Sequence, residues 1–181
     1  MRRPDLPNSL AILFLAKGGG RIDVDAARET GKKDRVVIGW NEYVDFPAWK
    51  IRGLKAKIDT GARTSALHVD NIEERSPNLV RFDVILHRKH THRRVTIEVP
   101  IVRRAQVRSS TGLYELRYFV RGTIRVGAVE KEIELSLAAR GPMLFRMLLG
   151  RNALAHDFLI DPGHRALATE KPRRKKVKTT R

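Results

Sequence analysis

Cysteine is absent from this chain of 181 residues. Its absence excludes disulfide bonds, thiolate zinc sites and a cysteine nucleophile, and it is compatible with a reducing compartment. The sequence also lacks a long apolar run, because the longest one, residues 10–16, falls far short of the ~20 residues that a membrane-spanning helix needs. We therefore expect a cytoplasmic protein that does not enter a membrane.

Acidic residues are scarce. The chain holds 20 of them against 37 Lys and Arg, which gives a formal net charge of +17. Such an excess favours an anionic partner: nucleic acid, acidic lipid or an acidic polypeptide. Residues 171–181 are rich in Lys and Arg and contain no acid or aromatic residue. We expect this tail to be disordered and to attract nucleic acid only non-specifically, because base stacking requires aromatic side chains.

The composition divides the chain into three parts. Residues 1–34 contain three consecutive glycines and a polar stretch, and we predict a poorly ordered extension. Residues 35–170 form the predicted domain, and residues 171–181 form the tail. Gly31 and Lys32 lack the glycine spacing of a phosphate-binding loop, so no ATP site is predicted.

Apolar and polar residues alternate along much of the domain. The alternation is clearest over residues 54–58, 80–86, 95–101, 114–120 and 133–137, with turn residues between these runs. This pattern predicts half-buried strands joined by short connections, and hence a small β-barrel or sandwich. A short helix is expected over residues 150–156, followed by a strand over 158–160.

The most informative segment is Asp59-Thr60-Gly61, which follows one predicted strand and precedes another. Gly61 lets its N–H approach the carboxylate closely, and the Thr60 hydroxyl can hold the loop. Ile58 and Ala62 add apolar surroundings. Two such carboxylates placed face to face share one proton, so one acts as a base and the other as an acid.

By itself, an Asp-Thr-Gly tripeptide is also typical of an ordinary turn. A second motif, Met-Leu-Leu-Gly-Arg-Asn-Ala-Leu at residues 147–154, changes the interpretation. Together with residues 37–44, 55–68, 107–110, 145–151 and 158–162, the two motifs resemble the bacterial retropepsin-like aspartic endopeptidases. That family is often labelled ATP-dependent zinc protease and is associated with RimK-type ATP-grasp glutamate ligases. The resemblance covers about residues 36–168.

The resemblance implies an all-β fold: a closed retropepsin-like barrel with one short C-terminal helix. It also implies an aspartic endopeptidase with Asp59, Thr60 and Gly61 as catalytic residues. The sequence contains one Asp-Thr-Gly and no duplicated half, so a dyad requires a homodimer in which two Asp59 carboxylates meet. His68 belongs to the family pattern, and we assign it either a supporting role behind the catalytic residues or a purely structural one.

Arginines flank the candidate site in sequence, and guanidinium groups bind carboxylates in pairs of hydrogen bonds. We therefore expect an acidic polypeptide substrate, such as a glutamate-modified protein. The predicted substrate-binding residues are Arg63, Arg108, Ser109 and Arg151, and the predicted flap is residues 108–112. The other arginines near the site are Arg103, Arg104, Arg117 and Arg146.

No cofactor is expected, despite the zinc and ATP in the family label. The only histidine cluster, His87, His90 and His92, lies among cations that would repel Zn²⁺, so we interpret it as an exposed hairpin tip. Two alternative functions remain open. One is a non-catalytic retropepsin-like module that regulates a RimK-type ligase, and the other is a basic RNA-binding β-barrel.

Overall fold

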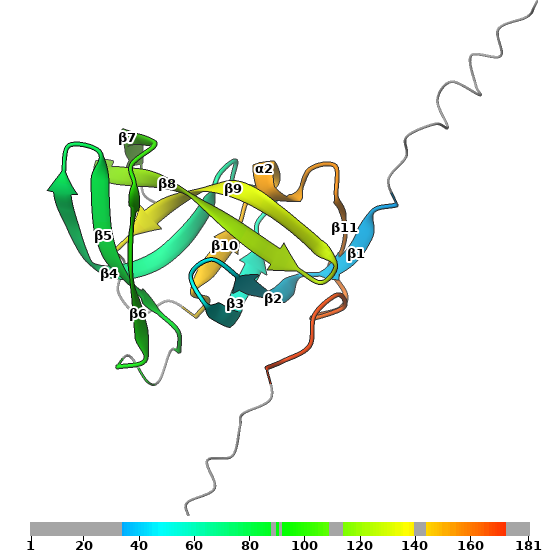
Figure 1. Ribbon diagram of the computed structural model, residues 1–181. Helices are drawn as coiled ribbons and strands as arrows, with labels where there is room; N and C mark the ends of the chain where they lie inside the picture. Colours follow the sequence, from blue (N-terminus) through cyan, green and yellow to red (C-terminus); the bar gives the residue numbers. More distant parts are fainter. Residues whose placement is uncertain (1–33, 88–89, 91, 109–113, 140–143, 173–181) are drawn as a thin grey trace, which may run out of the picture. The chain divides into compact units, whose positions relative to one another are not determined.

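The computed structural model describes residues 34–87, 90, 92–108, 114–139 and 144–172. Within these residues the chain is almost entirely β-structure (Figure 1). Its elements are β1 (Val36–Gly39), β2 (Asn41–Phe46), β3 (Ile51–Ile58), β4 (Ser65–Ser76), β5 (Leu79–Ile85), β6 (Arg94–Pro100), β7 (Arg103–Arg108), β8 (Tyr114–Val126), β9 (Val129–Ala138), β10 (Met147–Leu149), α2 (Arg151–Leu154) and β11 (Phe158–Asp161). Apart from Asp34, Lys171 and Pro172, the predicted extension and tail lie outside the described residues.

The strands form where the sequence alternates. In β3 the apolar Leu54, Ala56 and Ile58 are buried while the two intervening lysines are exposed. In β9 the buried Ile133, Leu135 and Leu137 follow the same period of two. Side chains of a strand point alternately to opposite faces, so each strand turns one apolar face toward a common core.

Six strands close into a barrel in the order β10-β3-β2-β8-β9-β4 (Figure 1). The short strand β10 completes the ring, because it pairs in parallel with β3 and antiparallel with β4. Strands β5 and β6 extend the sheet beyond β4, and β7 pairs with β8. The predicted all-β closed barrel with one short helix is confirmed for the described part of the chain.

A separate two-stranded sheet joins the two ends of the domain. β1 and β11 pair in parallel, with Val37 opposite Leu159. Both of these side chains are about half exposed, at 49% and 50%. Among the described residues neither strand pairs with any other, so this small sheet presents apolar side chains and two sheet edges outward.

The outer end of β8 departs from the predicted alternation. Tyr114 and Leu116 were expected to face the core, but they are 68% and 56% exposed. Arg117, which the alternation over residues 114–120 puts on the polar face of the strand, is only 6% exposed, and its guanidinium contacts the Glu115 carboxylate at 3.1 Å. The period of two is correct, but at this end of the strand the buried face carries the charged residue.

The segment after β11, residues 164–170, folds back along β2 and is called the strap below. The fully buried Glu42 carboxylate accepts hydrogen bonds from the backbone N–H groups of Leu167 and Ala168 and from the Thr169 hydroxyl. It also accepts one from Gly39 N–H at 2.7 Å. A buried carboxylate is stable only with such partners, so Glu42 ties the strap firmly to the barrel.

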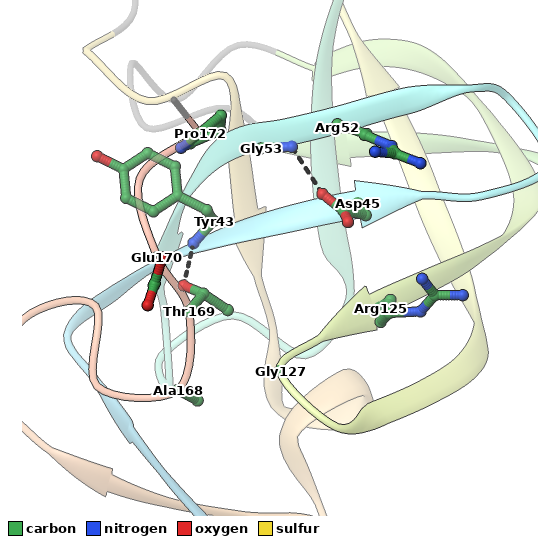
Figure 2. Close-up of a pocket in the computed structure, with 10 residues that line it drawn as sticks. All are labelled: Tyr43, Asp45, Arg52, Gly53, Arg125, Gly127, Ala168, Thr169, Glu170 and Pro172. Atoms are coloured by element: carbon green, nitrogen blue, oxygen red, sulfur yellow. Dashed lines mark hydrogen bonds between the residues drawn. The ribbon is translucent and has the colours of Figure 1, made fainter. Parts of the chain in front are cut away.

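The strap borders a pocket of about 530 Å³ (Figure 2). Two hydrogen bonds frame it: Gly53 N–H to Asp45 and Tyr43 N–H to the Thr169 hydroxyl. The remaining lining residues are Arg52, Arg125, Gly127, Ala168, Glu170 and Pro172. None of the residues of the Asp-Thr-Gly loop lines this pocket. Among the described residues, no helix is long and apolar enough to cross a bilayer.

Candidate functional site

Asp59 lies in the loop between β3 and β4, directly after the last residue of β3. Its carboxylate accepts hydrogen bonds from the N–H groups of Gly61 at 3.1 Å and Ala62 at 3.2 Å. Its own N–H donates to the Leu149 carbonyl at 2.9 Å. The close approach of the Gly61 N–H predicted from the sequence is therefore present, and one oxygen of Asp59 is held by the turn that follows it.

A second segment holds this loop from outside. The Arg151 guanidinium donates from Nη1 to the carbonyls of Thr60 at 2.7 Å and Gly61 at 2.9 Å. The Arg151 N–H donates to the Ala62 carbonyl at 2.9 Å. The Leu-Leu-Gly-Arg motif thus acts as a clamp on Asp-Thr-Gly, which is the physical reason that the two motifs occur together.

Gly150 lets the clamp approach the loop. A Cβ added at this position would lie 2.7 Å from the Thr64 carbonyl carbon and 3.0 Å from the Ala62 oxygen, both backbone atoms. The Gly150 N–H donates to the Ser65 hydroxyl at 3.1 Å, and both residues are buried. No side chain fits at this contact unless the loop moves, so the glycine is required for packing.

The loop lies at the surface of the single chain. Asp59 is half-buried, while Thr60, Gly61 and Arg63 are exposed. Among the described residues the Thr60 hydroxyl makes no hydrogen bond, and the loop is held through the Thr60 carbonyl instead. A single chain therefore offers one carboxylate on a rigid, exposed loop.

Of the other predicted substrate-binding residues, the structure describes Arg63, on this loop, and the backbone of Arg108. Arg63 is exposed, and its carbonyl accepts from the Asn152 N–H at 3.0 Å. Arg108 ends β7, and Ser109 and the rest of the predicted flap tip lie outside the described residues. The structure shows Arg151 as a loop clamp, and its contact with substrate stays a prediction.

Several of the other arginines are engaged within the chain. Arg103 pairs with Glu134 at 2.6 Å and lies 3.5 Å from the centre of the Phe119 ring. Arg104 pairs with Glu74 at 2.7 Å. The sequence carries no sign of these partners, because Glu134 is 31 residues from Arg103 and Glu74 is 30 residues from Arg104.

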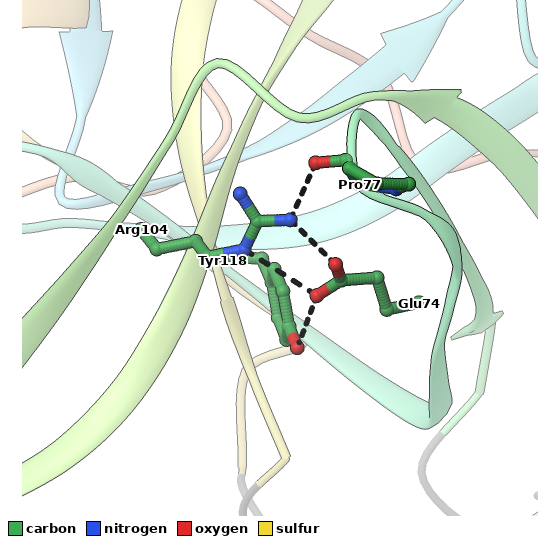
Figure 3. Close-up of polar contacts among 4 residues, drawn as sticks. All are labelled: Glu74, Pro77, Arg104 and Tyr118. Atoms are coloured by element: carbon green, nitrogen blue, oxygen red, sulfur yellow. Dashed lines mark hydrogen bonds and ion pairs between the residues drawn. The ribbon is translucent and has the colours of Figure 1, made fainter.

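Arg104 belongs to a polar cluster that ties the base of the β7–β8 hairpin to the β4–β5 hairpin (Figure 3). The Glu74 carboxylate accepts from Arg104 and from the Tyr118 hydroxyl at 3.0 Å, and Arg104 also donates to the Pro77 carbonyl at 2.6 Å. The hydrogen bond from Arg104 lowers the pKa of Glu74, and the bond to Glu74 raises the pKa of Tyr118. The cluster fixes the hairpin that carries Arg108.

His68 lies on β4, only 5% exposed, and its backbone N–H donates to the carbonyl of Arg146, the residue before β10, at 2.9 Å. Burial lowers the pKa of His68, and the charge of Arg146 lowers it further. The ring atom Nδ1 is buried and has no hydrogen-bond partner within the described part of the chain. Arg146 is equally buried, and the strand pattern gave no signal that these two side chains would meet.

The histidine cluster is a poor fit to a zinc site. The ring centres of His87 and His90 are 4.8 Å apart, and those of His90 and His92 are 5.6 Å apart. Within the described ranges, no group of three or more His, Cys, Asp or Glu side chains is arranged to hold a metal ion. These residues do not match the zinc in the family label.

Comparison with known proteins agrees with this architecture. A family model for the retropepsin-like aspartic endopeptidase RimB matches residues 37–171. A probable alpha-L-glutamate ligase of Shewanella pealeana is 36% identical over 143 residues, which is 76% of this chain and 31% of the relative. A protein of the same name from Parasynechococcus marenigrum is 35% identical over 71% of this chain and 28% of the relative. The chain thus spans about a third of the length of these curated relatives.

A solved structure shares the fold. It is a protein of unknown function from Legionella pneumophila, with a TM-score of 0.62 and 24% identity, covering 75% of this chain and 100% of the other. The closed barrel, the Asp59 loop with its Gly150–Arg151 clamp and the match over residues 37–171 agree with one another. The chain belongs to the RimB-like family of retropepsin-like aspartic endopeptidases.

Proposed function

We propose that this chain is an aspartic endopeptidase that acts as a homodimer, with one Asp59 from each copy. The observation that carries the proposal is the clamped loop, which holds a single carboxylate on the surface with one oxygen bonded to backbone N–H groups. A rigid carboxylate suits proton transfer at a fixed position.

In the proposed reaction the two Asp59 carboxylates hold one proton and one water between them. The ionised carboxylate takes a proton from the water, whose oxygen attacks the carbonyl carbon of the peptide bond. The protonated carboxylate donates its proton to the carbonyl oxygen and so completes a gem-diol. The gem-diol collapses as a proton passes to the leaving nitrogen, which releases an acid and an amine.

The small β1–β11 sheet supports the homodimer. It exposes Val37 and Leu159 side by side and carries unpaired edges. Exposed apolar side chains on a sheet edge favour pairing with another strand. A second copy with the same surface is the simplest such partner, because twofold contacts use one patch twice.

We further propose that the substrate is an acidic polypeptide, such as a glutamate-modified protein. The formal charge of +17 favours anionic chains. The curated relatives are named probable alpha-L-glutamate ligases, and a glutamate ligase makes an acidic product. A RimK-type ligase is therefore the partner whose product this enzyme would cleave.

A second candidate function is a non-catalytic module that regulates such a ligase. Its support is that the match covers only about a third of each relative and that the relatives are named for ligation. Cleavage assays separate the two functions. The purified chain and its Asp59→Asn variant would be incubated with a glutamate-rich peptide and its glutamine counterpart between about pH 4 and about pH 8, with a chelator present. Cleavage that resists the chelator and disappears in Asp59→Asn supports the peptidase. A verified dimer that cleaves neither peptide supports the regulatory module.

A further inference from the structure

The outer face of β4 and of the segment that leads into β10 carries a buried histidine and a buried arginine near the Asp59 loop. In β4, Leu67 and Val69 point into the core, so Ala66 and His68 point to the opposite face. The register of the two strands places Leu148 opposite Ala66, and the backbone bond between His68 and Arg146 continues that pairing. Ala66, His68, Arg146 and Leu148 therefore share one face.

Two polar side chains on this face are almost completely removed from solvent. His68 and Arg146 are each 5% exposed. Buried polar atoms are nearly always hydrogen-bonded, yet Nδ1 of His68 has no hydrogen-bond partner among the residues that the structure describes. A buried ring nitrogen without a partner among these residues costs stability, and the neighbouring guanidinium group makes the position suited to an anionic ligand.

The position of this face relative to Asp59 follows from the strands. β10 ends at Leu149, whose carbonyl accepts the Asp59 N–H, and β4 begins at Ser65, whose hydroxyl accepts the Gly150 N–H. His68 and Arg146 are each three residues from these contacts. At about 3.3 Å per residue, both lie roughly 10 Å along the strands from the loop. An extended peptide bound at Asp59 covers that distance with about three residues.

We propose that His68 and Arg146 form a subsite for a carboxylate side chain of the substrate, about three residues from the cleaved bond. This inference rests on the proposed function, because it assigns the specificity of the same site. Arg146 supplies the fixed positive charge, and His68 supplies the unoccupied Nδ1. The apolar Ala66 and Leu148 line the path between the subsite and the loop.

The chemistry of the pair predicts how binding responds to pH. Three groups act on the ring: Arg146 from directly before β10, Asp70 from β4 and the Ala138 carbonyl from β9. Without ligand, burial lowers the pKa of His68 and the charge of Arg146 lowers it further. A carboxylate placed against Nδ1 stabilises the imidazolium, so binding takes up a proton and strengthens as the pH falls.

The test measures binding without cleavage. A fluorescent hexaglutamate peptide and its hexaglutamine counterpart would be titrated into Asp59→Asn, and then into Asp59→Asn combined with Arg146→Met or with His68→Asn. Arg121→Gln in the same background is the matched control, because Arg121 pairs with Glu132 on an exposed part of the barrel and carries the same charge. We expect Arg146→Met to weaken hexaglutamate binding at least about tenfold, and Arg121→Gln to change it by less than about twofold. If Arg146→Met and Arg121→Gln weakened hexaglutamate binding equally, or if Arg146→Met did not weaken it, the proposed subsite would be overturned.

Further measurements separate a loss of binding from a loss of folding and test the role of Nδ1. Arg146→Lys, which retains the charge, should recover part of the affinity, and a melting curve for each variant shows whether it folds. Imidazole NMR, with the His68 signal identified by its absence in His68→Asn, should show the pKa of His68 rising when hexaglutamate is added. An unchanged pKa contradicts the assignment of Nδ1. If hexaglutamate binds selectively but the parent chain cleaves nothing, the subsite stands and the proposed peptidase fails.

Discussion

Replacing Gly150 by Ala tests the clamp on the Asp59 loop. The backbone of Gly150 has φ −84° and ψ 171°, a conformation that alanine adopts freely, so the substitution adds no backbone strain. The new Cβ would instead meet Thr64 C at 2.7 Å, Thr64 O at 2.8 Å and Ala62 O at 3.0 Å. Unstrained contacts of this kind are longer by about half an ångström, so the loop must move by a similar amount.

The expected cost follows from that movement. Overpacking a buried contact typically lowers the free energy of unfolding by about 1–3 kcal/mol, and we expect Gly150→Ala to fall in this range. A catalytic group displaced by a fraction of an ångström loses rate, so we expect peptidase activity to fall by about tenfold to about a hundredfold. The measurements are denaturant unfolding monitored by tryptophan fluorescence and the initial rate of peptide cleavage.

Gly163→Ala is the matched control. The added Cβ there would meet only a carboxylate oxygen of Asp161, at 3.2 Å, and that flexible side chain can move. We expect its unfolding free energy to change by less than about 1 kcal/mol and its activity to be retained. If Gly150→Ala behaved like Gly163→Ala in both assays, the reasoning about the clamp would be refuted.

Three other predictions follow from buried or clamping side chains. Glu42→Ala leaves the donors of the strap unsatisfied and should lower the unfolding free energy by about 3–5 kcal/mol in denaturant titrations, whereas Glu42→Gln, which keeps one accepting oxygen, should cost less; equal costs would contradict the role of that oxygen as an acceptor. The hydrogen bond from Thr96 holds the pKa of Asp83 below its ordinary 3.8, so stability should be lost as the pH falls below that value, and a pH series of Asp83→Asn should lack this part of the loss. Arg151→Met removes two hydrogen bonds to the Asp59 loop, and it should reduce the rate of peptide cleavage by a larger factor than it reduces the equilibrium constant for folding. An unchanged cleavage rate would show that the clamp is dispensable.

The sequence predicts the strands well because their alternation is local. The core positions of β3 and β9 follow from a period of two, and the loop between β3 and β4 follows from the Asp-Thr-Gly motif. The pairing of β10 between β3 and β4 does not follow, because three residues carry too little pattern to choose their neighbours. The family resemblance, rather than periodicity, predicted that the two motifs belong together.

The charged residues show where local reasoning ends. In the sequence Glu42 is an ordinary polar residue of a strand, yet it is fully buried. Its hydrogen-bond donors in the strap lie 125 to 127 residues further along the chain. Arg117 was expected on the polar face of its strand and is buried against Glu115. His68 was noted in the sequence, but its neighbour Arg146 lies 78 residues further along the chain, directly before β10. These contacts depend on the register of distant strands, which no short window of sequence encodes.

The central claim is that two Asp59 residues, one from each copy, form one active site. Wild-type chains and Asp59→Asn chains would be mixed in varying proportions, unfolded together, refolded, and assayed for peptide cleavage at constant total concentration. If catalysis requires both carboxylates, the rate follows the square of the wild-type fraction, so an equal mixture retains about a quarter of the full rate. A rate that falls in direct proportion to the wild-type fraction, with about half retained, would mean that each chain acts through its own Asp59 and would contradict the account.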